Sequence, residues 1–370
     1  MNFTCSRRDL VEAFNVVSKA VSAKPQMPIL SGIYMKAEGS TLELQANNFE
    51  MGIITKIPVN TEDPGEIVVT GKYLQEVVRK LSGETVNISH DESQHIANIK
   101  SDTANFKLLS MSSEDFPKVK SPETFSTFSI RAATLKNLIR KTAYACANEE
   151  VRPVFTGCCL ELAGNSVSMI ATNTHRLAIM KDTLEAELEN LAFIIPSKTL
   201  WELFKMLDVS DPSNSVTIEC SRKNISFTFD NIFMTSRLID GQFPPYDKVI
   251  LKTAETTATV KVSEMMDAVD RVALISKETE YNTIRFIFTQ EGINISSDSP
   301  EVGRAEEQIS ARIEGADIDI SFNVKYIVDV LKVIDTEECI IRLNKPLSPV
   351  DIREKDRNDF IYVVTPVRTN

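Results

Sequence analysis

The chain has few residues suited to acid–base or metal chemistry based on histidine. Its three histidines are His90, His95 and His175, and histidine is the side chain whose charge changes most readily near neutral pH. His90 and His95 share a polar stretch with Asp91 and Glu92. Four ligands at a spacing suited to zinc are not evident there, so we favour a solvated turn over a metal site.

The sequence motifs of common catalytic sites are absent. We find no G-x-S-x-G, H-E-x-x-H or G-x-G-x-x-G motif and no P-loop of the form G-x-x-x-x-G-K-S/T. With 12 glycines in 370 residues, loops that could cradle a phosphate are scarce. We therefore expect no catalytic residue, no cofactor and no bound metal.

One short segment could bind a ligand. Residues 171–178 read A-T-N-T-H-R-L-A, whereas the matching places in two further copies of the same pattern, residues 47–51 and 298–302, lack the His-Arg pair. A difference confined to one copy of a scaffold is better explained by a local task than by folding. His175 and Arg176 could form a ligand-binding edge, a hydrogen-bonded turn or a catalytic pair. We rank the binding edge first and the turn second.

Positive charge gathers in six segments whose apolar spacing is typical of amphipathic helices. These segments are residues 6–20, 69–81, 133–147, 195–207, 263–277 and 322–334, and their net charges sum to +7. Because the whole chain carries −11, the other residues carry −18. The main contributors to the positive charge are Arg7, Arg8, Lys72, Arg79, Lys80, Lys136, Arg140, Lys141, Lys198, Lys205, Lys325 and Lys332.

Lysine and arginine on helices neutralise phosphates without reading bases. For one helix taken alone, a solvated outer face is the ordinary explanation. Here related helices share the bias, so helices arranged around an axis would line a hole with positive charge. The acidic remainder would face outward and repel nucleic acid elsewhere.

The elements that position these residues occur three times. Segments starting at Val69, Ile195 and Phe322 read V-T-G-K-Y-L-Q-E-V-V-R-K-L, I-P-S-K-T-L-W-E-L-F-K-M-L and F-N-V-K-Y-I-V-D-V-L-K-V-I, at offsets of 126 and 127 residues. Each predicts an amphipathic helix entered from an extended segment. In each copy an alternating apolar stretch also follows a glycine turn, which predicts a β-hairpin.

The length fits several domains, because single cores stop growing at roughly 250 residues. We expect an α+β fold of three repeated domains, each with two helices packed on an antiparallel sheet, at residues 1–122, 123–253 and 254–370. The six cysteines show no C-x-x-C spacing and are expected to be buried, reduced thiols. They are Cys5, Cys146, Cys158, Cys159, Cys220 and Cys339.

No apolar stretch approaches the roughly 20 residues that a membrane-spanning helix needs. Arg7, Arg8, Asp9 and Glu12 also fall where a signal peptide would require an apolar core. We expect a cytoplasmic, nucleoid-associated protein without a membrane partner.

The whole chain resembles the DNA polymerase III beta subunits, the bacterial sliding clamps. The matches that carry this resemblance are residues 24–30 (K-P-Q-M-P-I-L), 171–178, 238–246 (L-I-D-G-Q-F-P-P-Y), 322–326 (F-N-V-K-Y) and 362–368 (Y-V-V-T-P-V-R). The resemblance implies three DNA-clamp domains per chain, forming half of a six-domain ring, with helices inside and sheets at the rim. It implies a processivity factor without catalysis. The implied partners are duplex DNA without sequence preference, a second copy of the chain, the polymerase catalytic subunit, the clamp loader and other clamp-binding peptides.

The resemblance also implies sites. Lys24 and Arg152 fall at positions that the family uses near DNA, and Phe106 would meet Leu274 and Ile275 at the dimer contact. The full set implied for DNA is Lys24, Lys72, Arg79, Lys80, Lys136, Arg140, Lys141, Arg152 and Lys198. The set implied for a peptide-binding pocket is Arg152, Phe155, Thr172, Thr174, His175, Arg176, Leu177, Pro244, Lys248, Val249, Tyr281, Asn323, Tyr326, Leu347, Val363, Val364, Pro366, Val367 and Arg368.

Where the family commonly has Asp-Gly-His-Arg, this chain has Asn173-Thr-His-Arg, and Pro349 replaces a small hydroxyl residue. Two alternatives stay open from the sequence: a peptide-binding scaffold that does not enclose DNA, and a three-domain enzyme that uses His175 and Arg176.

Overall fold

The computed structural model describes residues 1–22, 24–121, 123–149, 151–276 and 282–368. Within them the predicted helices form, and two of the helix starts are capped by side chains. Ser6 accepts a hydrogen bond from the Asp9 backbone N–H, and Asn323 accepts one from Lys325. The α-helices are α1 (Arg7–Val17), α2 (Gly71–Lys80), α3 (Ala132–Thr142), α4 (Ser197–Met206), α5 (Val262–Ser276) and α6 (Val324–Leu331). Short 3₁₀ turns lie at Ser18–Ala20, Pro28–Ser31, Ala143–Ala145, Pro153–Phe155 and Asp247–Val249.

The chain forms two compact units. The first contains Met1–Ala133 and Glu202–Leu238, and the second contains Thr134–Trp201 and Ile239–Asn370. Two units arise from three repeats because strands of neighbouring repeats pair with each other. β15 of the middle repeat pairs with β4 of the first, and β24 of the last repeat pairs with β12 of the middle one.

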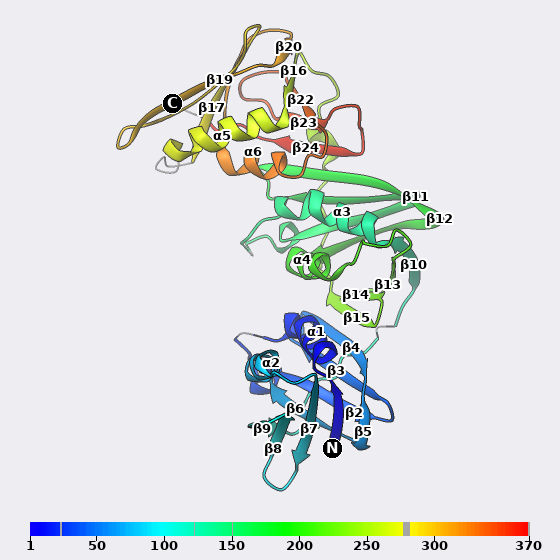
Figure 1. Ribbon diagram of the computed structural model, residues 1–370. Coiled ribbons are helices and arrows are strands. Elements are labelled where there is room, and N and C mark those ends of the chain that lie inside the picture. Colours follow the sequence, from blue (N-terminus) through cyan, green and yellow to red (C-terminus); the bar gives the residue numbers. More distant parts are fainter. Residues whose placement is uncertain (23, 122, 150, 277–281, 369–370) are drawn as a thin grey trace. The chain divides into compact units, whose positions relative to one another are not determined.

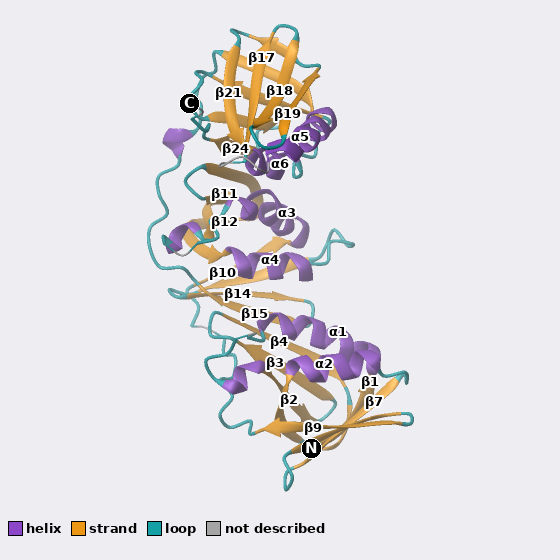
Figure 2. Ribbon diagram, turned by 90° about the vertical axis from the view of Figure 1, so that its left-hand side faces the viewer, coloured by secondary structure: helices purple, strands orange, loops and turns teal. Residues whose placement is uncertain are grey.

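The first unit is built on a thirteen-stranded antiparallel sheet. Helices α1 and α2 lie side by side on one face of it (Figures 1 and 2). In spatial order the strands are β10 (Ser126–Arg131), β13 (Ser215–Cys220), β14 (Asn224–Phe229), β15 (Ile232–Arg237), β4 (Met51–Pro58), β3 (Thr41–Asn47), β2 (Gly32–Glu38), β6 (Gly65–Thr70), β9 (Ala104–Met111), β8 (Ile96–Ser101), β7 (Thr85–Asp91), β1 (Asn2–Ser6) and β5 (Asn60–Asp63).

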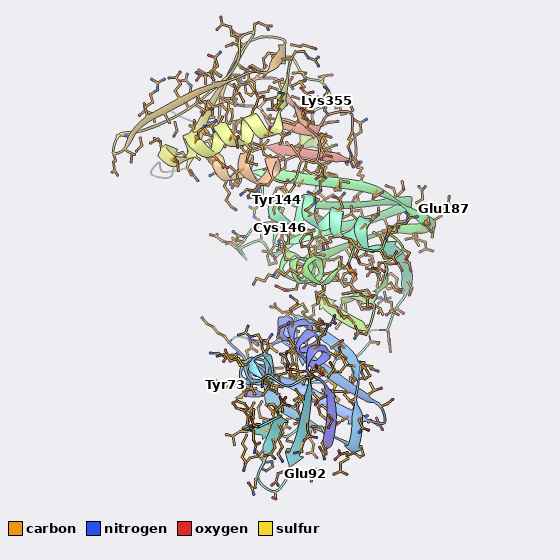
Figure 3. All side chains as sticks on the ribbon, viewed as in Figure 1. Tyr73, Glu92, Tyr144, Cys146, Glu187 and Lys355 are labelled. Carbon is orange, nitrogen blue, oxygen red and sulfur yellow. The ribbon has the colours of Figure 1, made fainter. Side chains whose placement is uncertain are left out.

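The second unit contains a seven-stranded and a four-stranded sheet, and α5 packs beside α6. β11 and β12 pair along their length, and Glu187 lies at the end remote from their connecting turn, next to Leu188, which pairs with Gly164 (Figure 3). The larger sheet runs β11 (Gly157–Thr172), β12 (Arg176–Pro196), β24 (Phe360–Val364), β23 (Val350–Glu354), β22 (Glu338–Leu343), β16 (Thr256–Lys261) and β20 (Arg312–Glu314). The smaller runs β19 (Gly303–Ile309), β18 (Gly292–Ser299), β17 (Thr283–Thr289) and β21 (Ile318–Asn323).

The repeated hairpins bury the predicted side chains. Leu42 and Leu44 of the first copy, Val167 and Met169 of the second, and Ile293 of the third are fully buried. Alternate residues of a strand face opposite sides of the sheet, so a period-two apolar pattern gives each hairpin one core face. All six cysteines are buried thiols, as predicted. The predicted repeat of α+β domains is therefore confirmed.

A buried ion pair joins α3 to the last repeat. The Lys141 Nζ lies 2.5 Å from Glu354 Oε1, and both side chains are fully buried. Asp335 contacts Lys141 at 2.9 Å and Arg140 at 2.5 Å. Burial would raise the pKa of Asp335, but the hydrogen bonds from Arg140 and Lys141 outweigh it and hold that pKa below its usual value. This charged cluster braces the middle repeat against the last one.

We predict that Lys141→Met lowers the free energy of unfolding by about 3–5 kcal/mol. It removes the close ammonium partner of the buried Glu354 carboxylate, which among the described residues keeps only the Asp335 N–H at 2.6 Å and the Arg357 guanidinium at 3.6 Å. Urea denaturation followed by circular dichroism measures the change. The matched control is Lys181→Met at an exposed site on β12, which should stay within about 0.5 kcal/mol. Adding Glu354→Gln to Lys141→Met should recover part of the loss, and the absence of any recovery would contradict this interpretation.

Candidate functional site

A cavity of about 230 Å³ opens in the second unit beside the His-Arg segment. Its walls come from the end of β11, the start of β12, the segment before Ile250 and the C-terminal strand. The residues predicted for the peptide pocket that line it are Phe155, Thr172, Thr174, His175, Arg176, Leu177, Pro244, Val249 and Val363. Residues from distant parts of the chain therefore meet at one small site.

The turn between β11 and β12 is held by side-chain hydrogen bonds. The backbone N–H groups of His175 and Arg176 both donate to Asn173 Oδ1 at 3.0 Å, and that of Thr174 donates to Thr172 Oγ1 at 3.1 Å. Thr174 adopts a φ of 76°, a left-handed conformation that costs a β-branched residue energy. A glycine at this position would avoid that cost.

Arg176 is a structural part of the pocket wall. Its guanidinium is buried, donates to Asp329 Oδ2 at 2.6 Å and also donates to the Tyr144 carbonyl oxygen. It lies over the Tyr326 ring at 4.7 Å and the Tyr144 ring at 5.5 Å. With these partners, Arg176 fixes the start of β12 against α6 and the turn after α3.

His175 is exposed and has the surroundings of a binding edge. Its ring stacks on Tyr326 with centroids 6.4 Å apart, and its carbonyl oxygen accepts from the Thr365 N–H at 2.9 Å. Among the residues described, the imidazole has no carboxylate partner that could orient it for proton transfer. The predicted binding edge fits this geometry, whereas the catalytic pair does not.

The floor of the cavity is apolar. Leu177 and Val363 belong to a buried cluster with Ile170, Ile179 and Ile194. Tyr246 covers one side, and its hydroxyl donates to Glu161 Oε2 at 2.7 Å. Burial and this hydrogen bond raise the pKa of Tyr246, so it remains a neutral donor. An apolar floor with a few placed polar groups suits an aliphatic or aromatic anchor.

The predicted pocket set omits four lining residues, Pro245, Tyr246, Pro349 and Thr365, although the sequence already shows Pro349 in place of a small hydroxyl residue. Pro245 and Tyr246 directly follow Pro244, so extending that motif by two residues would have found them. Val364 requires a correction. Its side chain is fully buried on the opposite face of β24 from Val363 and Thr365, because side chains alternate along a strand.

The remaining predicted pocket residues do not line this cavity. Tyr326 supports it from behind, since its hydroxyl accepts from Asn173 Nδ2 at 3.3 Å. Tyr281 lies outside the described residues. The others that do not line it are Arg152, Lys248, Asn323, Leu347, Pro366, Val367 and Arg368.

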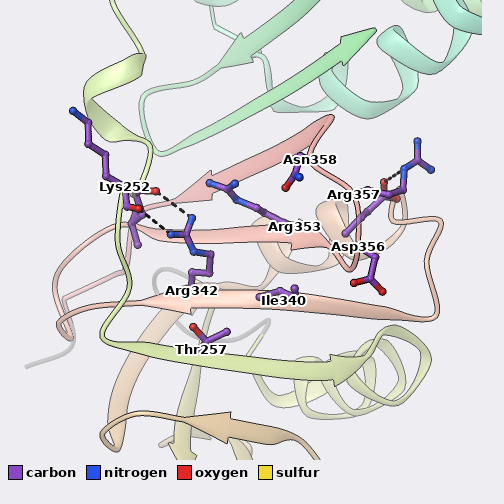
Figure 4. Close-up of a pocket in the computed structure, with 10 residues that line it drawn as sticks. Lys252, Thr257, Ile340, Arg342, Arg353, Asp356, Arg357 and Asn358 are labelled. Carbon is purple, nitrogen blue, oxygen red and sulfur yellow. Dashed lines mark hydrogen bonds and ion pairs between the residues drawn. The ribbon is translucent and has the colours of Figure 1, made fainter.

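A larger open cavity of about 650 Å³ lies over β22 and β23 (Figure 4). Its arginines are already engaged. Arg342 donates to the carbonyl oxygens of Leu251 and Lys252 at 3.1 and 3.3 Å, and Arg353 donates twice to the buried Asp351. The Arg342 contacts hold the connector between the last two repeats against β22. We therefore assign these lining arginines a structural role and do not regard this cavity as a binding site.

The predicted DNA-binding residues divide into two groups. Lys24, Lys72, Arg79, Lys80, Arg152 and Lys198 are exposed. Lys72, Arg79 and Lys80 all lie on α2, the latter two in its last turn. Lys72 lies over the ring of Tyr73, which points outward from the same helix (Figure 3). The prediction for Lys141 is wrong, because its ammonium is fully buried against Glu354 and cannot reach a phosphate. Arg140 is tied to Asp335, and Lys136 is partly buried.

The three predicted dimer residues are found on two elements, β9 and α5. Phe106 on β9 is 41% exposed and Leu274 on α5 is 63% exposed, while Ile275 is partly buried. No cluster of metal-ligating side chains is found in the part of the chain that the structure describes. No helix there is long and apolar enough to span a membrane.

Comparisons with known proteins cover the full chain. Three family models match: DNA polymerase III beta subunit, N-terminal domain at residues 1–120, central domain at residues 129–245, and C-terminal domain at residues 247–368. The beta sliding clamp of Bacillus subtilis is 33% identical and that of Staphylococcus aureus is 30% identical, each with 100% of both chains covered. The crystal structure of the Bacillus subtilis clamp superposes with a TM-score of 0.95, and that of the Pseudomonas aeruginosa subunit with 0.93 at 29% identity, again over both full chains.

We predict that Thr174→Gly raises the free energy of unfolding by about 0.5–1 kcal/mol. Relief of the left-handed conformation yields about 1–2 kcal/mol, and part of this is offset by the greater freedom of glycine in the unfolded chain. Urea denaturation measures the change. Thr183→Gly, at an ordinary extended position on β12, should instead destabilise the chain. A loss of stability in Thr174→Gly would overturn the assignment of strain.

Proposed function

This chain belongs to the DNA polymerase III beta subunit family, the bacterial sliding clamps, and we propose that two copies of it close into a ring around duplex DNA. The ring keeps the replicative polymerase on its template and makes or breaks no bond itself. Its three clamp domains per chain give six in the proposed ring.

The dimer proposal rests on a strand pairing between neighbouring repeats, which we call a joint and which occurs twice within one chain. β4 pairs antiparallel with β15, and β12 pairs antiparallel with β24. β19 is the third copy of β4 and β12, and β9 is the counterpart of β15 and β24. In the described residues, β19 and residues 104–109 of β9 lack the ladder partner that their counterparts have. Unpaired strand edges favour pairing with another chain. Head-to-tail pairing of β19 with the partner's β9 forms the same joint a third time, and such contacts close a ring when the rotation allows.

The side chains at these two edges are complementary. The β9 edge presents the exposed Phe106 and Lys107, and Leu274 lies exposed on α5 beside β19. β19 presents Glu306, which Arg304 of the same strand pairs at 2.9 Å within the single chain. Exposed apolar side chains near unpaired edges are costly in an isolated chain and stabilise an interface once covered. Opposite charges around them favour the correct register.

DNA retention in the proposed ring is topological. Exposed cations on the helices, such as Arg79 and Lys80, attract phosphates without reading bases. Because enclosure prevents escape, these contacts can remain weak, which allows the ring to slide. The net charge of −11 keeps the rest of the surface from competing for DNA.

Partners of the proposed clamp reach it through the cavity beside His175. An extended peptide inserts an aliphatic or aromatic side chain over Leu177 and Val363, and polar groups at the rim orient it. The polymerase catalytic subunit and the clamp loader are the partners we propose for this pocket. One shared pocket makes them compete, so the ring serves one partner per pocket at a time.

We predict that Phe106→Ala weakens the dimer about 30-fold, which corresponds to about 2 kcal/mol for an apolar anchor at an interface. Sedimentation equilibrium measures the dissociation constant. Leu274→Ala should act in the same direction, and the double variant should lose less than the sum, because the proposed dimer brings the two side chains into contact. The control is Val209→Ala, since Val209 is equally exposed at 41% and belongs to neither β9 nor β19. An unchanged dissociation constant in Phe106→Ala would exclude this interface.

We predict that the loaded protein stays on circular plasmid DNA at raised salt and leaves once the plasmid is cut. Raised salt suppresses simple phosphate attraction, so survival on circles alone reports enclosure. The fraction that co-elutes with DNA in gel filtration gives the readout. Phe106→Ala serves as the control because it retains every helix cation and weakens only the ring closure. Equal loss of the native protein from circular and linear DNA would disprove the ring.

A further inference from the structure

A second groove lies in the first unit, at the joint between the first and middle repeats. It encloses about 250 Å³, compared with about 230 Å³ for the cavity beside His175. Phe49, Met51, Val119, Lys120 and Arg237 are among its lining residues. Residues 47–51 are the repeat counterpart of residues 172–176, at an offset of 125. The two grooves therefore occupy equivalent places in successive repeats.

The turn beside this groove makes the same backbone hydrogen bonds as the turn beside the His175 cavity. The N–H groups of Glu50 and Met51 donate to Asn48 Oδ1 at 3.1 and 2.8 Å, as those of His175 and Arg176 donate to Asn173. Phe49 adopts a φ of 69°, compared with 76° for Thr174.

The strand that closes each groove is attached in the same way. The Arg237 N–H donates to the Glu50 carbonyl oxygen at 2.8 Å, and the Thr365 N–H donates to that of His175 at 2.9 Å. The same arrangement of turn and closing strand, which we call the frame, therefore forms both cavities, and their volumes are similar.

The side chains on this second frame are of a different kind. Lys118, Lys120 and Arg237 line the groove, and Glu50 is the one acid among its described lining residues. Lys118 is engaged by Glu66 at 3.1 Å. Lys120 and Arg237 are exposed, and no ion-pair partner is found for either within the described residues. The groove therefore carries excess positive charge at its rim.

The groove also has an apolar part. Phe49 is 46% exposed at the tip of the turn, where it can close over a bound side chain. Val119 forms the floor and approaches Gly52 so closely that a Cβ there would lie 2.8 Å from its methyl group. Because glycine allows this approach, the floor is set deeper than a side chain would permit. An apolar floor under a cationic rim distinguishes the groove from a simple phosphate site.

We infer that this groove is a second docking site, which takes a short extended acidic peptide with one apolar anchor from a partner protein. The anchor packs between Phe49 and Val119, and the flanking carboxylates face Lys120 and Arg237. Charge complementarity sets the partner class, because an acidic segment gains at this rim whereas a basic or neutral one does not. This inference stands independently of the pocket beside His175, although both use the same repeated frame.

The test uses the full-length protein and a fluorescein-labelled, capped peptide in which aspartates and glutamates flank a single leucine. Fluorescence anisotropy should show saturable binding below about 1 mM. We expect Lys120→Glu and Phe49→Ala each to weaken binding about tenfold or more. The matched control Lys181→Glu reverses one charge at an exposed site outside the groove and should leave the affinity unchanged. Thermal melts establish that the variants remain folded.

Three outcomes would overturn the inference. No saturable binding of the acidic peptide by the native protein is the first, and equal affinity in Lys120→Glu is the second. The third is displacement of the probe by a short DNA oligonucleotide in a manner that depends on Lys120 but not on Phe49, which would make the groove a phosphate site. A neutral peptide with a leucine anchor, which is aimed at the pocket beside His175, should bind Lys120→Glu as it binds the native protein. This last measurement separates a failure of the second site from a failure of the first.

Discussion

Pairing of strand edges is the constraint on which the rest of this structure depends. Each repeat alone would leave a long strand with unsatisfied backbone N–H and C=O groups, and burying or exposing such an edge is costly for a soluble protein. The chain meets this demand by laying β15 along β4 and β24 along β12. The joints unite three repeats into two compact units and bring the walls of both grooves together. They also leave β19 and residues 104–109 of β9 without the equivalent ladder partner among the described residues.

The same backbone turn occurs beside both grooves, so comparing the two repeats shows which residues serve the fold and which could serve binding. Asn48 and Asn173 make the same turn with the same backbone donors, so the turn belongs to the scaffold. The side chains that this turn presents differ: His175 and a buried Arg176 in one repeat, Phe49 and Glu50 in the other. Because the backbone geometry is fixed by the asparagine, substitutions around it change the chemistry of the groove at little cost to the fold.

Charge in this protein serves two purposes that composition alone does not separate. The exposed Arg79 and Lys80 are solvated and available to a polyanion. Lys141 has the same residue type and a similar helix position, but it lies in the interior against Glu354 and Asp335. A buried charge must be paired to be tolerated, so the partner from the last repeat determines the role of this lysine. The excess of positive charge on the helices is consequently smaller at the surface than in the sequence.

The sequence by itself determined the threefold repeat, the α+β class, the hairpins and the segment around His175. These follow from local patterns: the alternation at Leu42 and Leu44, the helical spacing after Val69 and the glycine turns. Only the tertiary structure decided that Val364 faces away from the pocket, that Lys141 is a brace, and that Tyr246 and Thr365 complete the wall. Those outcomes depend on which strand lies beside which, and on the face that each side chain then takes. A contact between residues far apart in the chain leaves no local pattern, so burial and pairing across repeats emerge only when the chain folds.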